Sequence, residues 1–345
     1  MSKRIQKIDQ LDSLRALAAF CVILHHFLPE YNIGTFSFGW IGVDVFFVVS
    51  GYLITAILLE QKAVITDKIL IIKNFVIKRA LRLFPVYYLF ITFFLILMCT
   101  IGLYVWDQGD GIYFYTYTQN ILFFREGMKG IQINHLWTLA VEEQFYLFWP
   151  WVLIYISNNR LIRILMIIIP LTMLFKSFFD MDDSRMLTLA HFDTLGSGAL
   201  MALLIKENRE QLLLFLNKIK ILTIIIPLLI LIVGTGYELP YFITVLAVLI
   251  LSTSMVNGCH YNFTGIFGRV LDLTFLKYLG KISYGLYLYH KPIPYFVKLV
   301  AGKSHIYINN IVLFLLSIIL TISISHLSFL ILEKRFLKLK NKFDL

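Results

Sequence analysis

The chain has 345 residues, of which 59% are hydrophobic and only 15% are charged, and its mean hydropathy is +0.78. Soluble domains average about 25% charged residues, so this composition excludes an ordinary soluble domain and indicates an integral membrane protein. The formal net charge of +10 would suit a nucleic-acid partner, but the placement of the basic residues along the chain excludes one.

Long apolar runs predict an all-α bundle of about ten transmembrane helices, in a single domain over residues 1–345 with no fused soluble domain. The fifth and seventh predicted spans are near the short limit, because a crossing takes about 20 apolar residues. An even number of spans places both termini on one side of the membrane. The predicted spans cover residues 11–28, 38–60, 83–105, 137–157, 161–176, 187–205, 220–236, 239–257, 277–299 and 309–332.

The basic residues are distributed unevenly over the predicted connections. If the N-terminus is cytoplasmic, 23 of the 31 Lys and Arg lie on the cytoplasmic side and 7 lie outside, with Arg15 inside the first span counted apart. Cytoplasmic loops of membrane proteins carry such an excess, so the predicted topology is N-in and C-in. The longest outer connection, residues 106–136, is rich in glycine and aromatic residues, which predicts a loop at the outer interface. Both a passive role and a covering or substrate-contacting role remain open for it.

The first predicted span carries Arg15 and His26, which are eleven residues apart. Eleven helical steps return to within roughly 20° of the starting direction, so both side chains lie on one stripe, about 16 Å apart along the axis. Ionisable groups inside a membrane usually face a cavity or a partner, which favours a functional pair. In the alternative interpretation, Arg15 reaches the headgroups and His26 caps a helix end.

The second predicted span contains Asp44 near its outer end, followed by Ser50 and Gly51. A carboxylate within an apolar run needs a partner, and an aspartate beside His26 would fix its tautomer and raise its basicity. Equally, Asp44 would cap a helix start. Ser50 and Gly51 are interpreted as a close-packing contact between helices rather than as a nucleophile site.

Arg79 and Arg82 stand one helical turn apart at the predicted mouth of the third span. Arginines at this spacing share a helix face, and their planar guanidinium groups can bind two phosphate oxygens. The alternative is an ordinary cytoplasmic anchor of positive charge.

The fourth predicted span places His135, Glu142 and Tyr146 on one face, provided that the helix begins early. Glu143 lies about 100° from Glu142, so one of the two acids points inward and the other needs separate solvation. Two adjacent acidic residues inside a span indicate either a functional role or a structural pairing of buried groups, rather than a chance occurrence. Further weak signals are His191 and Asp193 in the sixth span, His290 before a proline in the ninth, and Glu333 at the end of the tenth.

Taken together, these stretches resemble the acyltransferase-3 family of integral membrane acyltransferases, in order and over essentially the whole chain. The family's arginine and histidine, with ten residues between them, correspond to Arg15 and His26, and its RxxR pair corresponds to Arg79 and Arg82. Its aspartate corresponds to Asp44 and its late glutamate to Glu333. The matching stretches are LDSLRALAAFCVILHHF, GVDVFFVVSGYLI, IKRALRLFPVYY, HLWTLAVEEQFYLFWP and ISYGLYLYHKP.

The resemblance implies a multi-pass protein of the cytoplasmic (inner) membrane that moves an acyl group, usually acetyl, from acetyl-CoA to a sugar hydroxyl. The acceptor would be an extracytoplasmic envelope saccharide or lipid-linked glycan. Acyl-CoA would be a donor substrate, and neither a permanently bound cofactor nor a metal is implied. The alternative class is a secondary transporter or flippase for a glycolipid or saccharide, and no oligomeric state is implied.

In the mechanism that this resemblance suggests, Arg79 and Arg82 bind the coenzyme A phosphates on the cytoplasmic side. Arg15 lines the thioester passage or pairs with Asp12. His26, oriented by Asp44 or Glu142, removes the proton of the incoming hydroxyl. A relay, in which the acyl group rests on a side chain before the final transfer, remains the alternative.

Overall fold

A computed structural model of the protein describes residues 8–100, 109–128, 132–178, 185–234, 237, 239–303 and 308–340. All regular secondary structure in these residues is helical, so the predicted all-α class is confirmed. The basic N-terminal segment before residue 8, and parts of the predicted outer loop at 106–108 and 129–131, lie outside the described residues.

Six helices within the described residues are long and apolar enough to cross a membrane, and all six coincide with predicted spans. A seventh is added if α9 (Gln211–Lys218) and α10 (Lys220–Val233), which are bent by 70° at their junction, form one crossing. The total of ten spans and the N-in/C-in topology therefore stay predictions. The six are α1 (Asp9–Glu30), α2 (Ile41–Val64), α3 (Lys68–Thr100), α7 (Asn158–Phe178), α11 (Tyr241–His260) and a helix over Asn310–Lys340.

The third helix begins much earlier than the sequence predicted. The apolar run starts near residue 83, but α3 starts at Lys68 and is 33 residues long. Lysine and arginine are good helix formers, so a basic stretch continues a helix although its hydropathy resembles that of a loop. Arg79 and Arg82 consequently lie well inside α3 rather than at its start.

The ninth predicted span, residues 277–299, is not one continuous helix. It is divided among α13 (Thr274–Lys281), α14 (Ser283–Tyr289) and α15 (Pro292–Lys303). Pro292 has no backbone N–H to donate to a preceding turn, so it starts a new helix instead of continuing the old one. The sixth predicted span is also shorter than expected, because α8 (Thr194–Lys206) follows the single turn η3 (Thr188–His191).

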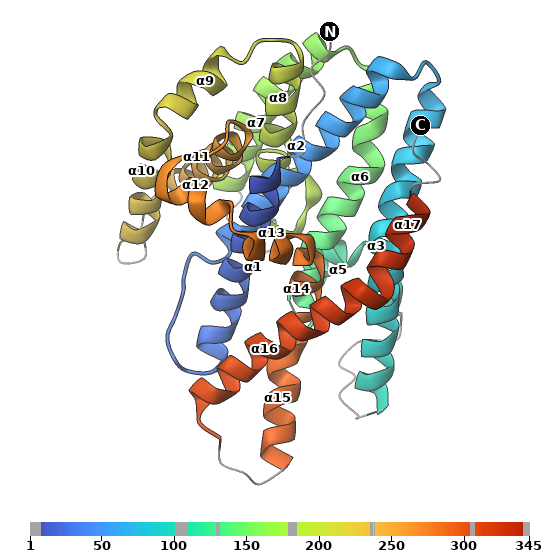
Figure 1. Cartoon of the computed structure of the whole chain (residues 1–345), viewed down its shortest axis with the longest axis vertical. Coiled ribbons are helices and arrows are strands. Elements are labelled where there is room, and N and C mark those ends of the chain that lie inside the picture. The colour runs from blue at the N-terminus through green and yellow to red at the C-terminus, as the bar shows by residue number, and fades with distance from the viewer. Residues whose placement is uncertain are drawn as a thin grey trace.

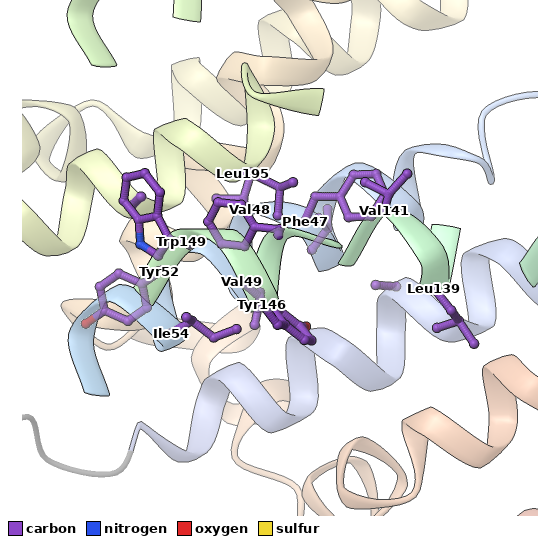
Figure 2. Close-up of a cluster of buried hydrophobic side chains, with 14 of the residues drawn as sticks. Phe47, Val48, Val49, Tyr52, Ile54, Leu139, Val141, Tyr146, Trp149 and Leu195 are labelled. Atoms are coloured by element: carbon purple, nitrogen blue, oxygen red, sulfur yellow. The ribbon is translucent and has the colours of Figure 1, made fainter. Parts of the chain in front are cut away.

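Helix α2 forms the centre of the bundle. Within its most apolar window 72% of the residues are buried, against 28% for the helix over Asn310–Lys340. Figure 2 shows Phe47, Val48 and Tyr52 of α2 gathered with Trp149 of α6 (Trp137–Tyr155) and Leu195 of α8. A helix covered on most sides can place polar side chains into interior cavities instead of lipid.

Small residues allow the helices around α2 to approach closely. A Cβ atom on Gly51 of α2 would lie 2.0 Å from the Leu195 carbonyl oxygen, and one on Gly198 of α8 would lie 2.1 Å from the Val48 carbonyl oxygen. The predicted packing role of Gly51 is therefore confirmed, and Gly198 makes the same kind of contact from α8. Gly280 of α13 likewise lies against the backbone of Asp12 in α1.

The last helices wrap across the bundle. α16 (Asn310–Ser328) packs against α14 and α15, continues through the π-helical turn η4 (Phe329–Glu333), and ends in α17 (Lys334–Lys340) beside α3 (Figure 1). The short α12 (Gly265–Leu271) precedes α13 and packs on α1. These contacts bring α14 and η4 to the side of α1 that carries Arg15 and His26.

The described part of the outer connection folds back onto the bundle. It forms α4 (Gly111–Tyr115), α5 (Gln119–Glu126) and the turn η1 (Asn134–Leu136). The Tyr87 hydroxyl donates to the Phe114 carbonyl over 3.0 Å, and the Gln119 amide donates to the Leu136 carbonyl over 2.8 Å. This connection thereby positions His135 at the start of α6.

Candidate active site

Three adjoining cavities run along α2 and contain most of the side chains singled out by the sequence. After the predicted orientation we call them the outer, middle and inner cavities. Val43 and Asp44 of α2, with Trp40 just before it, line the outer cavity. Side chains of α2 between residues 43 and 57 line the middle cavity, and side chains between residues 53 and 60 line the inner one. The middle cavity shares Val43, Thr138 and Tyr287 with the outer one. It shares Arg15, Leu53, Ile57 and Arg82 with the inner one. The polar groups thus follow one line through the bundle.

The inner cavity is rich in charge. Arg15, Arg82 and Lys281 line it together with Asp12 and Glu333. Glu333 is only 5% exposed and sits in the π-helical turn η4, which turns its carboxyl group toward the basic residues. The structure therefore brings together three residues that lie far apart in sequence: Arg15, Arg82 and Glu333.

The middle cavity holds a hydrogen-bonded group of α2 and α6. The Ser50 hydroxyl donates to Glu142 Oε1 over 2.7 Å and lies 3.0 Å from the Tyr146 hydroxyl. The Arg79 guanidinium carbon is 5.1 Å from the centre of the Tyr146 ring, a cation–π geometry. Ser50 thus contacts Glu142 and Tyr146 in the wall of the middle cavity, whereas its neighbour Gly51 packs against the backbone of α8.

Of the two adjacent acids, Glu142 faces the cavity. Glu143 is 5% exposed and its Oε1 atom has no hydrogen-bond partner among the described residues. The 100° between successive residues of a helix explains this division, which the sequence left open. Tyr146 shares the face of Glu142 as predicted, but His135 lies in the outer cavity instead.

The outer cavity contains His26, whose contacts differ from the expected ones. His26 Nδ1 lies 3.0 Å from the Val22 carbonyl oxygen and 3.2 Å from Nε2 of His290. The sequence predicted that Asp44 or Glu142 would orient this ring. The structure instead places His290, the C-cap residue that follows α14, against it.

His135 packs edge-on against the same pair, with its ring centre 4.7 Å from that of His290. Burial, reinforced by the charge of Lys291, lowers the pKa of His135 well below its ordinary value. His135 is therefore a neutral ring next to the His26–His290 contact.

Asp44 lies in the first turn of α2 and lines the outer cavity beside different partners. Lys176 of α7 and Asp193 at the start of α8 line the same cavity and form a buried ion pair of 2.8 Å. His191 packs against the rings of both Phe47 and Trp137, at centre distances of 4.7 Å and 5.3 Å. The outer cavity is thus lined by aromatic rings, carboxylates and cations together.

Sequence reasoning missed two features of this site. The first is the buried ion pair of Lys176 with Asp193, although a lysine at the end of an apolar run is itself a signal of a buried partner. The His26–His290 contact joins residues that are 264 positions apart, and no local pattern could predict it.

Comparison with known proteins places this chain in a family. The sequence profile of the family described as "Acyltransferase domain", the acyltransferase-3 family, matches residues 8–329. The chain therefore belongs to the acyltransferase-3 family.

Two curated relatives carry more specific names. Peptidoglycan O-acetyltransferase OatA of Listeria monocytogenes is 30% identical over 360 residues, covering 94% of this chain and 55% of the relative. O-acetyltransferase OatA of Staphylococcus aureus is 29% identical over 368 residues, covering 96% of this chain and 58% of the relative. The chain thus spans a little more than half the length of these relatives. No solved structure matches it significantly.

Proposed function

We propose that this protein is a membrane O-acyltransferase that moves an acetyl group from acetyl-CoA to a hydroxyl of an extracytoplasmic envelope saccharide. The observation that carries the proposal is the line of three adjoining cavities from Arg82 and Glu333 at one end to His26 at the other. The names of the OatA relatives support an acetyl donor group and an envelope acceptor.

The basic residues at the inner end of the line of cavities suit the binding of the donor, acetyl-CoA. Coenzyme A carries phosphates, and arginine binds phosphate oxygens through paired, charge-assisted hydrogen bonds. Arg15 and Arg82 line both the inner and the middle cavity, and Arg79 lines the middle one. The extended arm of the donor would then reach through the middle cavity, past Ser50 and Glu142, toward the outer cavity.

The outer end suits the transfer step. The acceptor hydroxyl attacks the thioester carbonyl, His26 takes the hydroxyl proton, a C–O ester bond forms and the C–S bond breaks. The thiolate of coenzyme A then takes the proton back from the His26 imidazolium, so no proton or electron is left over. Trp40, Trp137 and Tyr241 line this cavity beside Asp44 and offer aromatic faces and polar groups to a sugar.

The cavities also support the predicted orientation in a cytoplasmic membrane. The inner cavity is lined by Leu11 at the start of α1 and by Leu337 near the end of α17, so the first and last described helices meet at the basic end. Acyl-CoA is made in the cytoplasm, which favours that end as the cytoplasmic one. Ten spans with N-in and C-in would agree with this placement.

A transporter or flippase for a glycolipid could also use a line of cavities across the bundle. Membership of an acyltransferase family favours the enzyme. The two classes differ in what happens to the donor, because only the enzyme releases free coenzyme A.

Purified protein in liposomes, supplied with labelled acetyl-CoA and cell-wall saccharide fragments, tests the proposal. We expect release of free coenzyme A and label in the saccharide, and a loss of at least about 100-fold in rate for His26→Ala, since general-base catalysis contributes about 10²–10⁴-fold. His326→Ala, on α16 and outside the lining of the three cavities, is the matched control and retains the rate. Full activity of His26→Ala, or uptake of saccharide without acylation, would contradict the proposed function.

A further inference from the structure

Two imidazole rings from opposite ends of the sequence meet in the wall of the outer cavity, which His26 lines and behind which His290 is buried. His26 is in the last two turns of α1, and His290 is the C-cap residue that directly follows α14. Their facing nitrogens, His26 Nδ1 and His290 Nε2, are 3.2 Å apart, within hydrogen-bond distance. One of these two nitrogens must therefore carry the proton and the other must accept it.

The backbone decides which nitrogen of His290 carries its proton. His290 Nδ1 lies 2.6 Å from the carbonyl oxygen of Tyr287, and a carbonyl oxygen only accepts. Nδ1 of His290 is therefore the protonated nitrogen. The ring is completely buried, which favours its uncharged form because a buried charge is costly. In that form Nε2 carries no proton and presents a lone pair to His26.

The same reasoning then fixes the tautomer of His26. Its Nδ1 atom faces two acceptors, the Val22 carbonyl oxygen at 3.0 Å and the lone pair of His290 Nε2 at 3.2 Å. Only a protonated Nδ1 satisfies both. Nε2 of His26 is consequently the unprotonated nitrogen, and it is the one left for a molecule in the outer cavity.

We propose that His290 is a positioning residue that holds His26 as the Nδ1–H tautomer, so that Nε2 of His26 is the atom that accepts the proton of the acceptor hydroxyl. This inference rests on the proposed function and specifies the basic atom of its transfer step. His290 does for His26 what a carboxylate does for the histidine of a catalytic triad, but as a neutral acceptor.

A neutral partner has a specific consequence for the transfer step. When His26 Nε2 takes the hydroxyl proton, the Nδ1–H group becomes part of an imidazolium, and its hydrogen bonds to Val22 and His290 become charge-assisted and stronger. The His26–His290 contact therefore stabilises the ring more after proton transfer than before it. His135 also packs edge-on against the His290 ring and restricts its rotation.

The tautomer can be measured without any activity assay. Nitrogen-15 magnetic resonance of histidine-labelled protein in lipid distinguishes protonated from unprotonated ring nitrogens, and comparison with His26→Gln identifies the signals of His26. We expect a proton on Nδ1 and none on Nε2. A His26 protonated on Nε2 in the wild-type protein would overturn the proposal.

Two substitutions of His290 separate positioning from folding. His290→Leu removes the acceptor, and we expect kcat to fall about 10- to 100-fold, as for other partners that orient a functional histidine, with the KM for acetyl-CoA unchanged. His290→Gln keeps an acceptor oxygen within reach of His26 Nδ1, so it retains most of kcat and the Nδ1–H signal. His326→Gln is the matched histidine control.

The outcomes distinguish this inference from the proposed function. An equal kcat for His290→Leu and wild type would overturn the positioning role. So would an equal loss of kcat in His290→Leu and His290→Gln, provided that both variants elute like the folded wild-type protein. Full activity of His26→Ala would instead overturn the proposed function, and the magnetic resonance result would still decide the tautomer.

Discussion

At the scale of single residues, the proposed donor site depends on Arg79 and Arg82, which share a face of α3. Arg79 packs over the rings of Phe75 and Tyr146, at 5.6 Å and 5.1 Å from their centres. These rings hold the guanidinium in a fixed place in the middle cavity wall. A lysine could not reproduce such a stacked, planar arrangement.

Arg79→Ala should weaken the binding of coenzyme A. A hydrogen bond to a charged group contributes about 1.5–3 kcal/mol, which corresponds to about a 10- to 100-fold change in Kd. Titration calorimetry with purified protein measures it. Arg163→Ala, which removes an exposed arginine of α7, is the control and leaves the affinity unchanged. Equal affinities of Arg79→Ala and wild type would remove Arg79 from the donor site.

The sequence predicted many of these residues because their signals are local. The helical period places Arg15 and His26 on one face. Asp44 and Glu142 can be recognised as candidate site residues without knowledge of the fold, because each is an acidic residue inside an apolar run. The partners of these groups could not be predicted in the same way. Whether His26 meets Asp44 or His290 depends on how α1, α2 and α14 pack, which is set by contacts hundreds of residues apart.

At the scale of elements, close packing of α2 against α8 fixes the walls of the cavities. Gly51 and Gly198 let the two backbones touch, and this position of α2 places Ser50 against Glu142 of α6. The sequence predicted the small-residue contact but not the helix ends. Hydropathy locates apolar surface, and it therefore misses the basic first turns of α3 and the breaks on either side of α14.

Gly51→Ala should destabilise the protein. Its new methyl group would meet the Leu195 backbone, which cannot rotate away, and overpacking of this kind costs about 1–3 kcal/mol. Thermal unfolding in detergent should show a lower Tm. Gly196→Ala is the matched control, since a methyl group there meets only side chains at 3.4 Å. Equal Tm values for the two variants would contradict the packing described for α2 and α8.

At the scale of the whole molecule, the account requires that the inner cavity opens to the cytoplasm. Ile69 lies in the first turn of α3 and Ile112 lies in α4, within the connection that follows α3, and both are exposed, at 53% and 59%. In a background without Cys21, Cys99 and Cys259, Ile112→Cys should react with a membrane-impermeant thiol reagent added to intact cells. Ile69→Cys should react only after the membrane is opened, and the reverse pattern would invert the proposed topology.

The central claim is that one bundle takes the donor at its basic end and acylates the acceptor at the other. The most direct measurement uses liposomes that contain the protein in a single known orientation. Acetyl-CoA is enclosed on the side of the inner cavity and the saccharide is supplied on the side of His26. We predict acetylated saccharide on the side of His26 and free coenzyme A on the side of the inner cavity. Acetylation only when both substrates share one compartment would contradict the account.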